Sequence, residues 1–348
     1  MKRIFSYLCI VPLVLTVGAC SPAVEPEAEA PAPVAPVEPE GPVRSIVNIT
    51  GDLYRAQNDG HFTVFLVTEE GIIMSDPINR DFATWLKGEL EERFAQPVRY
   101  VLYSHSDFDH ASGGEVFADT AEFVGHENML EALAEPSDMA LSADVAEMDT
   151  NGNGEIELAE AMDNLENNFA LFDANGDSML SGGEIARGPV GDVYAPTETY
   201  SDMRTIELGG KSVEMYHPGA AHSANMSVLY FPEESTAFVV DFIALNRLPF
   251  AALPGYDHDI WASAIRSVEA LGAEVIVPGH GNVGTTADVA AHRQYLAELH
   301  DAVAEGIAAG SSLEELQASV TMDAYSDWLN FEQWRALNVE GMYNFLNM

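Results

Sequence analysis

Short apolar or alternating stretches, separated by turns, are interspersed with segments of helical periodicity in the first part of the chain. Residues 62–67 and 71–76 flank a Glu-Glu-Gly turn and predict a β-hairpin. The next predicted elements are a helix at 82–94, strands at 98–103 and 122–125, and a helix at 126–134. Alternating strands and helices with short connections favour an α/β or α+β fold built in layers.

Predicted strands and helices follow one another again after residue 190. The predicted elements there are strands at 204–208, 212–216, 226–231, 237–241 and 275–278, and helices at 260–271, 286–308 and 312–320, the last two closing the chain. We therefore predict one domain from residue 43 to residue 348, interrupted by an insertion between its halves.

The segment between the two halves has a different composition. Residues 136–186 contain twelve acidic residues and no lysine or arginine. Loops 149–160 and 173–184 within it place oxygen donors at loop positions 1, 3, 5 and 12 and resemble the calcium loops of EF-hands. The resemblance implies an all-α EF-hand pair at 138–187, with Ile156 and Leu180 paired across the loops.

Both loops contribute to the expected calcium ligands. These are Asp149, Asn151, Asn153, Glu155 and Glu160 in the first loop, and Asp173, Asn175, Asp177, Met179 and Glu184 in the second. Ser178 stands where the first loop has Gly154, which weakens the bend expected there. We expect calcium to hold this acidic segment folded rather than to act as a switch, because its carboxylates otherwise repel one another. The alternative is a solvated loop without an ion.

The first residues have the pattern of an export signal. Residues 1–19 combine a basic start with an apolar run too short to span a bilayer. The sequence before Cys20 resembles a bacterial lipobox, which implies cleavage there and lipidation of Cys20; the alternative is an ordinary secretory signal. Residues 20–42 read as a flexible linker rich in Pro, Ala, Val and Glu. We expect an exported lipoprotein on the periplasmic or cell-surface side.

The net charge limits the classes of binding partner, and the positions of the cysteines limit the types of metal ligand. The formal net charge is −41, which argues against nucleic acid and anionic membrane surfaces as partners, because phosphate binding needs clustered Lys and Arg. We expect a small-molecule substrate, and membrane contact only through the lipid anchor at Cys20. The two cysteines, Cys9 and Cys20, both lie in the leader, so any metal in the body must be held by nitrogen and oxygen donors.

Residues 104–112, directly after the predicted strand at 98–103, carry the strongest chemical signal. His105, Asp107, Asp109 and His110 place two imidazoles and two carboxylates in one short turn. Such groups are costly to bury unless a cation gathers them. The segment therefore predicts a metal site.

Three further candidate ligands follow predicted strands in the second half: His222, Asp241 and His280. Together with the first segment, their order resembles the metallo-β-lactamase superfamily, in which an H-x-H-x-D-H motif, a His, an Asp and a final His bind two metals. The resemblance implies a four-layer αββα sandwich. It also implies one metal at His105 and His222, a second at Asp109, His110 and His280, and Asp241 as the bridge.

Asp107 departs from the superfamily pattern because most members have a second His there. A carboxylate hardens the site and shifts its preference from zinc toward iron or manganese. The flavodiiron branch of the superfamily has a Glu at this point and binds iron. We take zinc as the first choice for the two transition metals, with iron or manganese as alternatives.

The expected function is that of an exported metal-dependent hydrolase. Two cations lower the pKa of a bridging water, and the resulting hydroxide attacks the carbonyl of a small cyclic amide, ester or thioester, as in β-lactamases, lactonases and thioesterases. Asp109 is the candidate catalytic proton carrier, and Asn225 the candidate substrate-binding residue. Two alternatives remain: an iron-dependent oxidoreductase resembling flavodiiron proteins, and a calcium-dependent binding protein with a decayed metal site.

The remaining histidines and aromatics receive lesser roles. We expect the loop at 253–259, with Tyr256, Asp257 and His258, to line the mouth of the site. Phe62, Phe242 and Leu245 are assigned to an apolar wall or to the core. The remaining histidines are expected to be structural or at the surface, with His217 the best candidate to support a metal ligand: His61, His126, His217, His258, His292 and His300.

Overall fold

The computed structural model describes residues 41–134 and 139–348. The predicted signal peptide at 1–19, Cys20 and nearly all of the linker at 20–42 lie outside the described residues, as does residue 138 of the predicted insertion. Among the described residues, no helix has the length and apolar character needed to cross a membrane.

The first half of the domain forms a seven-stranded sheet. Its strands β1 to β4 form an antiparallel meander, and β4, β5, β6 and β9 run parallel to one another. In spatial order they are β1 (Arg44–Thr50), β2 (Leu53–Asn58), β3 (His61–Thr68), β4 (Gly71–Ser75), β5 (Val98–Leu102), β6 (Glu122–His126) and β9 (Glu198–Tyr200).

The second half forms a five-stranded sheet. Four of its strands are antiparallel neighbours, and the last pair is parallel. The strands are β10 (Met203–Leu208), β11 (Lys211–Tyr216), β12 (Val228–Phe231), β13 (Thr236–Val239) and β14 (Val275–Pro278).

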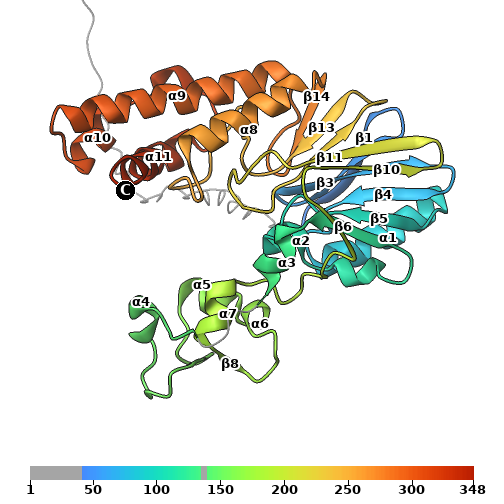
Figure 1. The fold of residues 1–348 in the computed structure, drawn as a ribbon, viewed down its shortest axis with the longest axis horizontal. Helices are drawn as coiled ribbons and strands as arrows, with labels where there is room; N and C mark the ends of the chain where they lie inside the picture. The colour runs from blue at the N-terminus through green and yellow to red at the C-terminus, as the bar shows by residue number, and fades with distance from the viewer. Residues whose placement is uncertain (1–40, 135–138) are drawn as a thin grey trace, which may run out of the picture. The chain divides into compact units, whose positions relative to one another are not determined.

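Helices cover the outer faces of both sheets. The first sheet is covered by α1 (Arg80–Phe94), and the connections that follow hold α2 (Phe108–Ala111), the 3₁₀ turn η1 (Gly114–Phe117) and α3 (Asn128–Leu133). The helical elements beside the second sheet are α8 (His258–Ala270), α9 (Thr286–Ala308), α10 (Leu313–Ser319), η2 (Asp323–Tyr325) and α11 (Phe331–Leu346). Figure 1 shows α8, α9 and α11 together on one side of the sheets and α1 on the other.

Three apolar clusters separate these layers. Leu66 and Ile73 of the first sheet pack with Leu229 and Phe238 of the second, so the two sheets face each other. A second cluster joins the first sheet to α1, and a third joins the second sheet to α8, α9 and α11. Burial of apolar surface on both faces accounts for the nearly continuous apolar sequences of the central strands β4, β12 and β13. The predicted four-layer αββα sandwich is confirmed.

The C-terminal helix is the longest element that the pattern missed, besides the strands β1 and β2, because α11, and not the helix at 312–320, closes the chain. Its buried face includes Asn338 and Gly341, which interrupt the apolar period. Asn338 Nδ2 donates to the carbonyl oxygens of Pro249 and Ala251, at 3.0 and 2.7 Å, and Gly341 lies against the backbone of Ala252. The polar positions therefore attach the loop at 249–253 to the helix.

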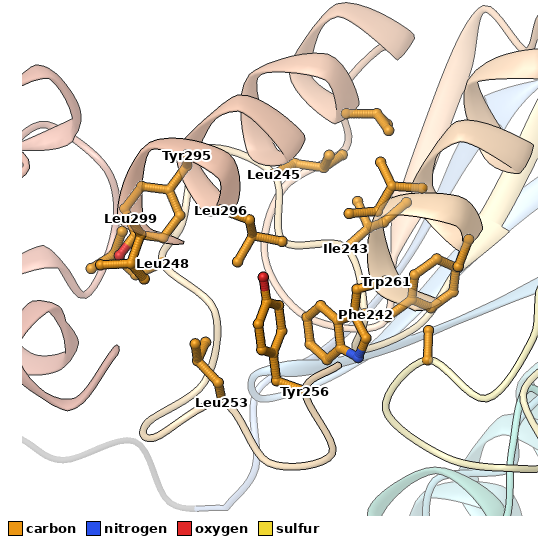
Figure 2. Packing of buried hydrophobic residues seen from close by; sticks show 14 of the residues in the cluster. Phe242, Ile243, Leu245, Leu248, Leu253, Tyr256, Trp261, Tyr295, Leu296 and Leu299 are labelled. Atoms are coloured by element: carbon orange, nitrogen blue, oxygen red, sulfur yellow. The ribbon is translucent and has the colours of Figure 1, made fainter. Parts of the chain in front are cut away.

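The loop at 253–259 lines the site's cavity through Leu253 and Pro254, but Tyr256, which was expected at the mouth, is buried in the core. Its ring packs edge-on against Trp261 at 5.2 Å, and its hydroxyl bonds His258 Nδ1 at 2.9 Å. Asp257 caps the start of α8. Figure 2 shows Tyr256 and Trp261 next to each other in the cluster that also contains Phe242 and Leu245, so these last two are core residues.

The insertion has a small core of its own. Its elements are α4 (Ala143–Ala146), β7 (Ile156–Glu157), α5 (Asp163–Asn167), α6 (Phe169–Phe172), β8 (Met179–Leu180) and α7 (Gly182–Arg187). β7 and β8 pair through Ile156 and Leu180, as predicted. The segment is not all-α, because these residues form a two-stranded sheet. Between the two loops, the short helices α5 and α6 meet at Asn168, where φ is −118°.

Candidate metal centre

The candidate ligands converge from five places in the chain. They follow β5, occupy the short helix α2, or stand in the loops after β11, β13 and β14. The ends of these strands lie close together, so side chains more than a hundred residues apart meet at one edge of the sandwich. The seven side chains are His105, Asp107, Asp109, His110, His222, Asp241 and His280.

The first group of ligand atoms comprises His105, Asp107, His222 and Asp241, all within 4.8 Å of one another. Asp107 Oδ2 lies 3.1 Å from His222 Nε2 and 3.5 Å from His105 Nε2. Asp241 Oδ2 lies 3.3 Å from His105 Nε2 and 3.6 Å from His222 Nε2. These separations match those between donors that share one transition metal.

The second group comprises His110, Asp241 and His280. The Nε2 atoms of the two histidines are 3.1 Å apart, and Asp241 lies 3.4 Å from His110 and 3.3 Å from His280. Asp109 Oδ2 is 3.7 Å from each histidine nitrogen. Asp241 thus contacts both groups, which is the position of a bridging ligand.

Polar atoms in the centre indicate that these residues fit a metal. His105 is fully buried and its Nε2 has no hydrogen-bond partner. Two imidazole nitrogens facing each other at 3.1 Å, as in His110 and His280, repel unless a proton or cation lies between them. The donor set of nitrogen and oxygen, without sulfur, suits zinc, iron or manganese.

The charges at the centre shift several pKa values strongly. Burial favours the neutral form of Asp241 and Asp107, but the neighbouring histidines outweigh it and hold both pKa values well below their usual range. Burial disfavours the charged form of His105 and His110, yet the carboxylates raise the pKa of each. For His280, burial dominates and lowers the pKa to about 4. Four imidazoles beside three carboxylates therefore offer strong negative potential to a cation.

Asp76, at the end of β4, supports the first group from beneath and was missed in the sequence. Its side chain is fully buried and accepts hydrogen bonds from Ser104 N, at 2.8 Å, and Ser104 Oγ, at 2.6 Å. Because that hydroxyl proton is given to Asp76, Ser104 Oγ accepts the proton on His105 Nδ1, at 2.9 Å. His105 Nε2 is thereby left with its lone pair directed at the centre. The sequence feature that could have identified Asp76 as a supporting residue is its position directly after the apolar strand at 71–75.

Asn225 does not line the cavity that opens over the ligand groups, which argues against its assignment as a substrate-binding residue. It is 2% exposed, its Oδ1 accepts from Ser106 N at 2.8 Å, and its Nδ2 donates to Ser106 Oγ at 3.0 Å. The amide is therefore buried and bonded to Ser106 through both its oxygen and its nitrogen. It fixes the loop that carries His105 and Asp107.

The other histidines also differ from expectation. His61 was assigned a structural or surface role, but its Nε2 lies 3.2 Å from Asp109 Oδ2 at the centre. His217, the expected support for a ligand, instead stacks on His126 at 3.9 Å and bonds Met226 O. His126 ends β6 instead of opening a helix.

A cavity of about 500 Å³ opens over the ligand groups. Its walls beyond the metal centre are apolar and largely aromatic: Phe108, Phe250, Leu253, Pro254, Trp261 and Trp334. Arg247 is the cation that lines it, and its guanidinium lies 5.3 Å from the Trp334 ring. Among the described residues, no carboxylate lies within 4 Å of this guanidinium, and its Nε has no hydrogen-bond partner. A negatively charged group is therefore the natural complement inside the pocket.

The two acidic loops of the insertion adopt tight turns around their first residues. Asp149 accepts backbone hydrogen bonds from Gly152, Asn153 and Gly154, and Asp173 does the same in the second loop. Glu184 is fully buried, and its Oε1 has no hydrogen-bond partner. Clusters of three or more His, Cys, Asp or Glu with convergent ligand atoms occur, in the described ranges, at the sheet edge and not in these loops.

Comparison with known proteins places these features in a family. The sequence model of the Metallo-beta-lactamase superfamily matches residues 81–280, more than half of the chain. A curated linear primary-alkylsulfatase of a Pseudomonas species is 22% identical over 264 residues, which are 73% of this chain and 48% of that protein. The chain thus spans about half the length of this relative.

Solved structures share the fold at low sequence identity. A stereoselective inverting sec-alkylsulfatase from a Pseudomonas species aligns with a TM-score of 0.59 and 15% identity, over 87% of this chain and 50% of that one. A metallo-beta-lactamase from Pontibacter korlensis aligns with a TM-score of 0.50 and 17% identity, over 72% of this chain and 98% of that one.

Proposed function

The chain belongs to the metallo-beta-lactamase superfamily, and we propose that it is a metal-dependent hydrolase of a small ester, thioester or cyclic amide. The observation that carries this proposal is the convergence of seven nitrogen and oxygen ligands at the base of an apolar pocket. A buried polar cluster of this kind is costly without a cation, and its position below a cavity gives a substrate access to it.

Two cations are the proposed cofactors, zinc in the first place and iron or manganese as alternatives. His105, Asp107 and His222 would hold the first, Asp109, His110 and His280 the second, and Asp241 would contact both. Such a pair supplies a water of lowered pKa and polarises the bond to be cleaved.

The chain's own residues supply positioning and proton transfer. Asp109 is the proposed proton carrier, because 31% of its side chain remains exposed toward the cavity that it lines. Arg247 would orient an anionic group of the substrate, and the aromatic walls formed by Phe250, Trp261 and Trp334 would exclude water from its apolar part. The alkylsulfatase relatives add sulfate esters to the candidate substrates.

The direct test is elemental analysis of the purified mature protein together with a substrate panel. We expect two zinc ions per chain and turnover of at least one among nitrocefin, lactones, thioesters and an alkyl sulfate such as octyl sulfate. His105→Ala with His222→Ala should abolish turnover, whereas His300→Ala, on the surface, should not. Full metal loading without hydrolysis of any member of the panel would contradict the proposal.

Asp107 is the specific feature that favours the second candidate, an iron-dependent oxidoreductase. A carboxylate in the first ligand group favours a harder metal than zinc. Two irons per chain together with reduction of oxygen or nitric oxide would establish this candidate. Calcium binding without any transition metal or hydrolysis would instead indicate a calcium-dependent binding protein.

We also propose that the insertion binds calcium structurally. The buried Oε1 of Glu184, without a partner, supports an ion at the second loop, since a buried carboxylate oxygen is costly when unpaired. A calcium titration followed by calorimetry should give two sites and a higher melting temperature; no bound calcium would refute the assignment.

Export and lipidation at Cys20 form a separate proposal. Replacing Cys20 by Ser in the full chain should abolish incorporation of labelled fatty acid and release the protein from the membrane fraction. Unchanged labelling would refute the assignment.

A further inference from the structure

We propose that His61 is an additional ligand of the second metal, a role that the superfamily motif does not include. This inference rests on the proposed two-metal centre. It concerns a side chain at the start of β3, in the hairpin β2–β3 and outside the motif that contains Asp109 and His110.

The geometry places His61 among the ligand atoms of that position. His61 Nε2 lies 3.2 Å from Asp109 Oδ2, and the ligand atoms of His61, Asp109 and His280 all lie within 4.8 Å of one another. Asp109 Oδ2 is the same oxygen that lies 3.7 Å from His280 Nε2. Donors around one transition metal are separated by about 3 to 4 Å, so this spacing suits a shared ion.

The backbone holds His61 and His280 together as a unit. The two residues form an antiparallel bridge, and Phe62 N donates to Gly279 O at 2.9 Å. His280 Nδ1 donates to Gly60 O at 3.0 Å, which leaves its Nε2 lone pair for a metal. The rings of His61 and His280 meet edge to face, with centroids 4.6 Å apart. The turn before β3 therefore orients two imidazoles at once.

The electrostatic setting also favours a ligand over a surface histidine. His61 lines the cavity, with one third of its side chain exposed, and its Nε2 is hydrogen-bonded to Asp109 Oδ2. Addition of its nitrogen to those of His110 and His280 and to the oxygens of Asp109 and Asp241 brings five protein donors to the second position. Such a set favours a coordination number above four.

A simpler role must be separated from this one. In this simpler role, His61 donates a hydrogen bond to Asp109 and thereby orients it, without binding the metal. Glutamine retains an amide donor near the place of Nε2 but is a poor metal ligand, whereas alanine removes both functions. The two substitutions therefore distinguish ligation from positioning.

The experiment loads the full protein and its variants with Co²⁺ and measures stoichiometry by elemental analysis, affinity by chelator competition, and coordination number by visible absorption. We expect His61→Ala and His61→Gln to bind the second ion at least about tenfold more weakly. Their absorption should become stronger, as expected when the coordination number falls toward four. His300→Ala is the matched control. His300 does not belong to the centre, and its Nδ1 lies 3.2 Å from a carboxylate oxygen of Asp301, the same distance that separates His61 Nε2 from Asp109.

Each other outcome is decisive. Wild-type affinity and absorption in His61→Gln, with a loss confined to His61→Ala, would overturn ligation in favour of a hydrogen bond to Asp109. No change in either variant would overturn any role in metal binding. Failure of the wild-type protein to bind a second Co²⁺ would refute the two-metal centre itself and, with it, this inference.

Discussion

Asp107 Oδ2 lies 3.1 Å from His222 Nε2, although 115 residues separate them. The same oxygen is 3.5 Å from His105 Nε2, so the carboxylate faces both imidazoles of the first ligand group. Asp107 thus places a carboxylate oxygen in the first ligand group, where we expect most of the superfamily to have a nitrogen. We expect this exchange, which adds a negative charge, to shift the metal preference of the centre from zinc toward iron or manganese.

We expect Asp107→His to raise the zinc-to-iron ratio severalfold, because an imidazole is neutral and softer than a carboxylate. The measurement is elemental analysis of protein loaded from an equimolar mixture of the two metals. Asp107→Glu is the control, since it retains the carboxylate and should leave the ratio close to that of the wild type. An identical ratio in the histidine variant would show that Asp107 does not determine metal choice.

Arg247 should select ligands that combine an anion with an apolar tail. Trp261 and Trp334 line the same cavity, so their fluorescence reports its occupancy. We expect the wild type to bind 1-octanesulfonate, which cannot be hydrolysed, at least about tenfold more tightly than 1-octanol, because a charge-assisted hydrogen bond contributes about 1.5–3 kcal/mol.

In Arg247→Met this preference should disappear, and Arg247→Lys should retain part of it. Arg93→Met is the matched control, because Arg93 pairs with Glu89 on the surface of α1. Equal binding of the two ligands by the wild type would exclude an anion site at Arg247.

In the second of the proposed calcium loops, Ser178→Gly should raise the affinity for calcium. Ser178 has φ of 69°, a left-handed conformation that a side chain disfavours by about 1 kcal/mol relative to glycine. The substitution should therefore raise calcium affinity several-fold, measured by calorimetry. The reverse exchange, Gly154→Ser, at φ of 89° in the first loop, should weaken binding there. We therefore expect Ser178→Gly to raise the calcium affinity and Gly154→Ser to lower it. A lower calcium affinity in both variants would contradict this account.

His292 should make stability depend on pH. Burial, assisted by Arg247, lowers its pKa from 6.5 to about 4, against the opposing effect of its bond to Phe242 O. Below pH 6.5, His292 is therefore protonated in the unfolded chain but stays neutral in the folded chain until the pH approaches 4. The contribution of neutral His292 to the free energy of unfolding is fully present above about pH 6.5. It is lost as the pH falls to about 4, and the total loss is about 3 kcal/mol.

Urea unfolding over this pH range should show a shallower loss of stability in His292→Gln than in the wild type, because glutamine can still donate to Phe242 O but does not titrate. The comparison between the two proteins removes the contribution of the metal-binding histidines, which is common to both. Parallel pH profiles would exclude His292 as the source.

Local patterns predicted the elements that depend on neighbouring residues. The helix at 286–308 agrees with α9 at both ends, and Ile156 pairs with Leu180 as the resemblance to an EF-hand pair implied. Helix α11 was missed because Asn338 and Gly341 replace apolar residues on its buried face for reasons that lie in the loop at 249–253. Polar contacts of this kind leave no periodic signal.

Sequence alone determined the list of candidate metal ligands, because the density of His and Asp at residues 104–112 predicted a metal site and the order of the later His and Asp residues resembled the superfamily motif. Tertiary structure decided how they are supported and what lies around them. His61 reaches Asp109 across 48 residues, Asp76 orients Ser104 across 28, and Asn225 turns toward Ser106 instead of the cavity. These contacts depend on how strands from both sheets align, and strand alignment is set by the packing of the whole core rather than by any local pattern.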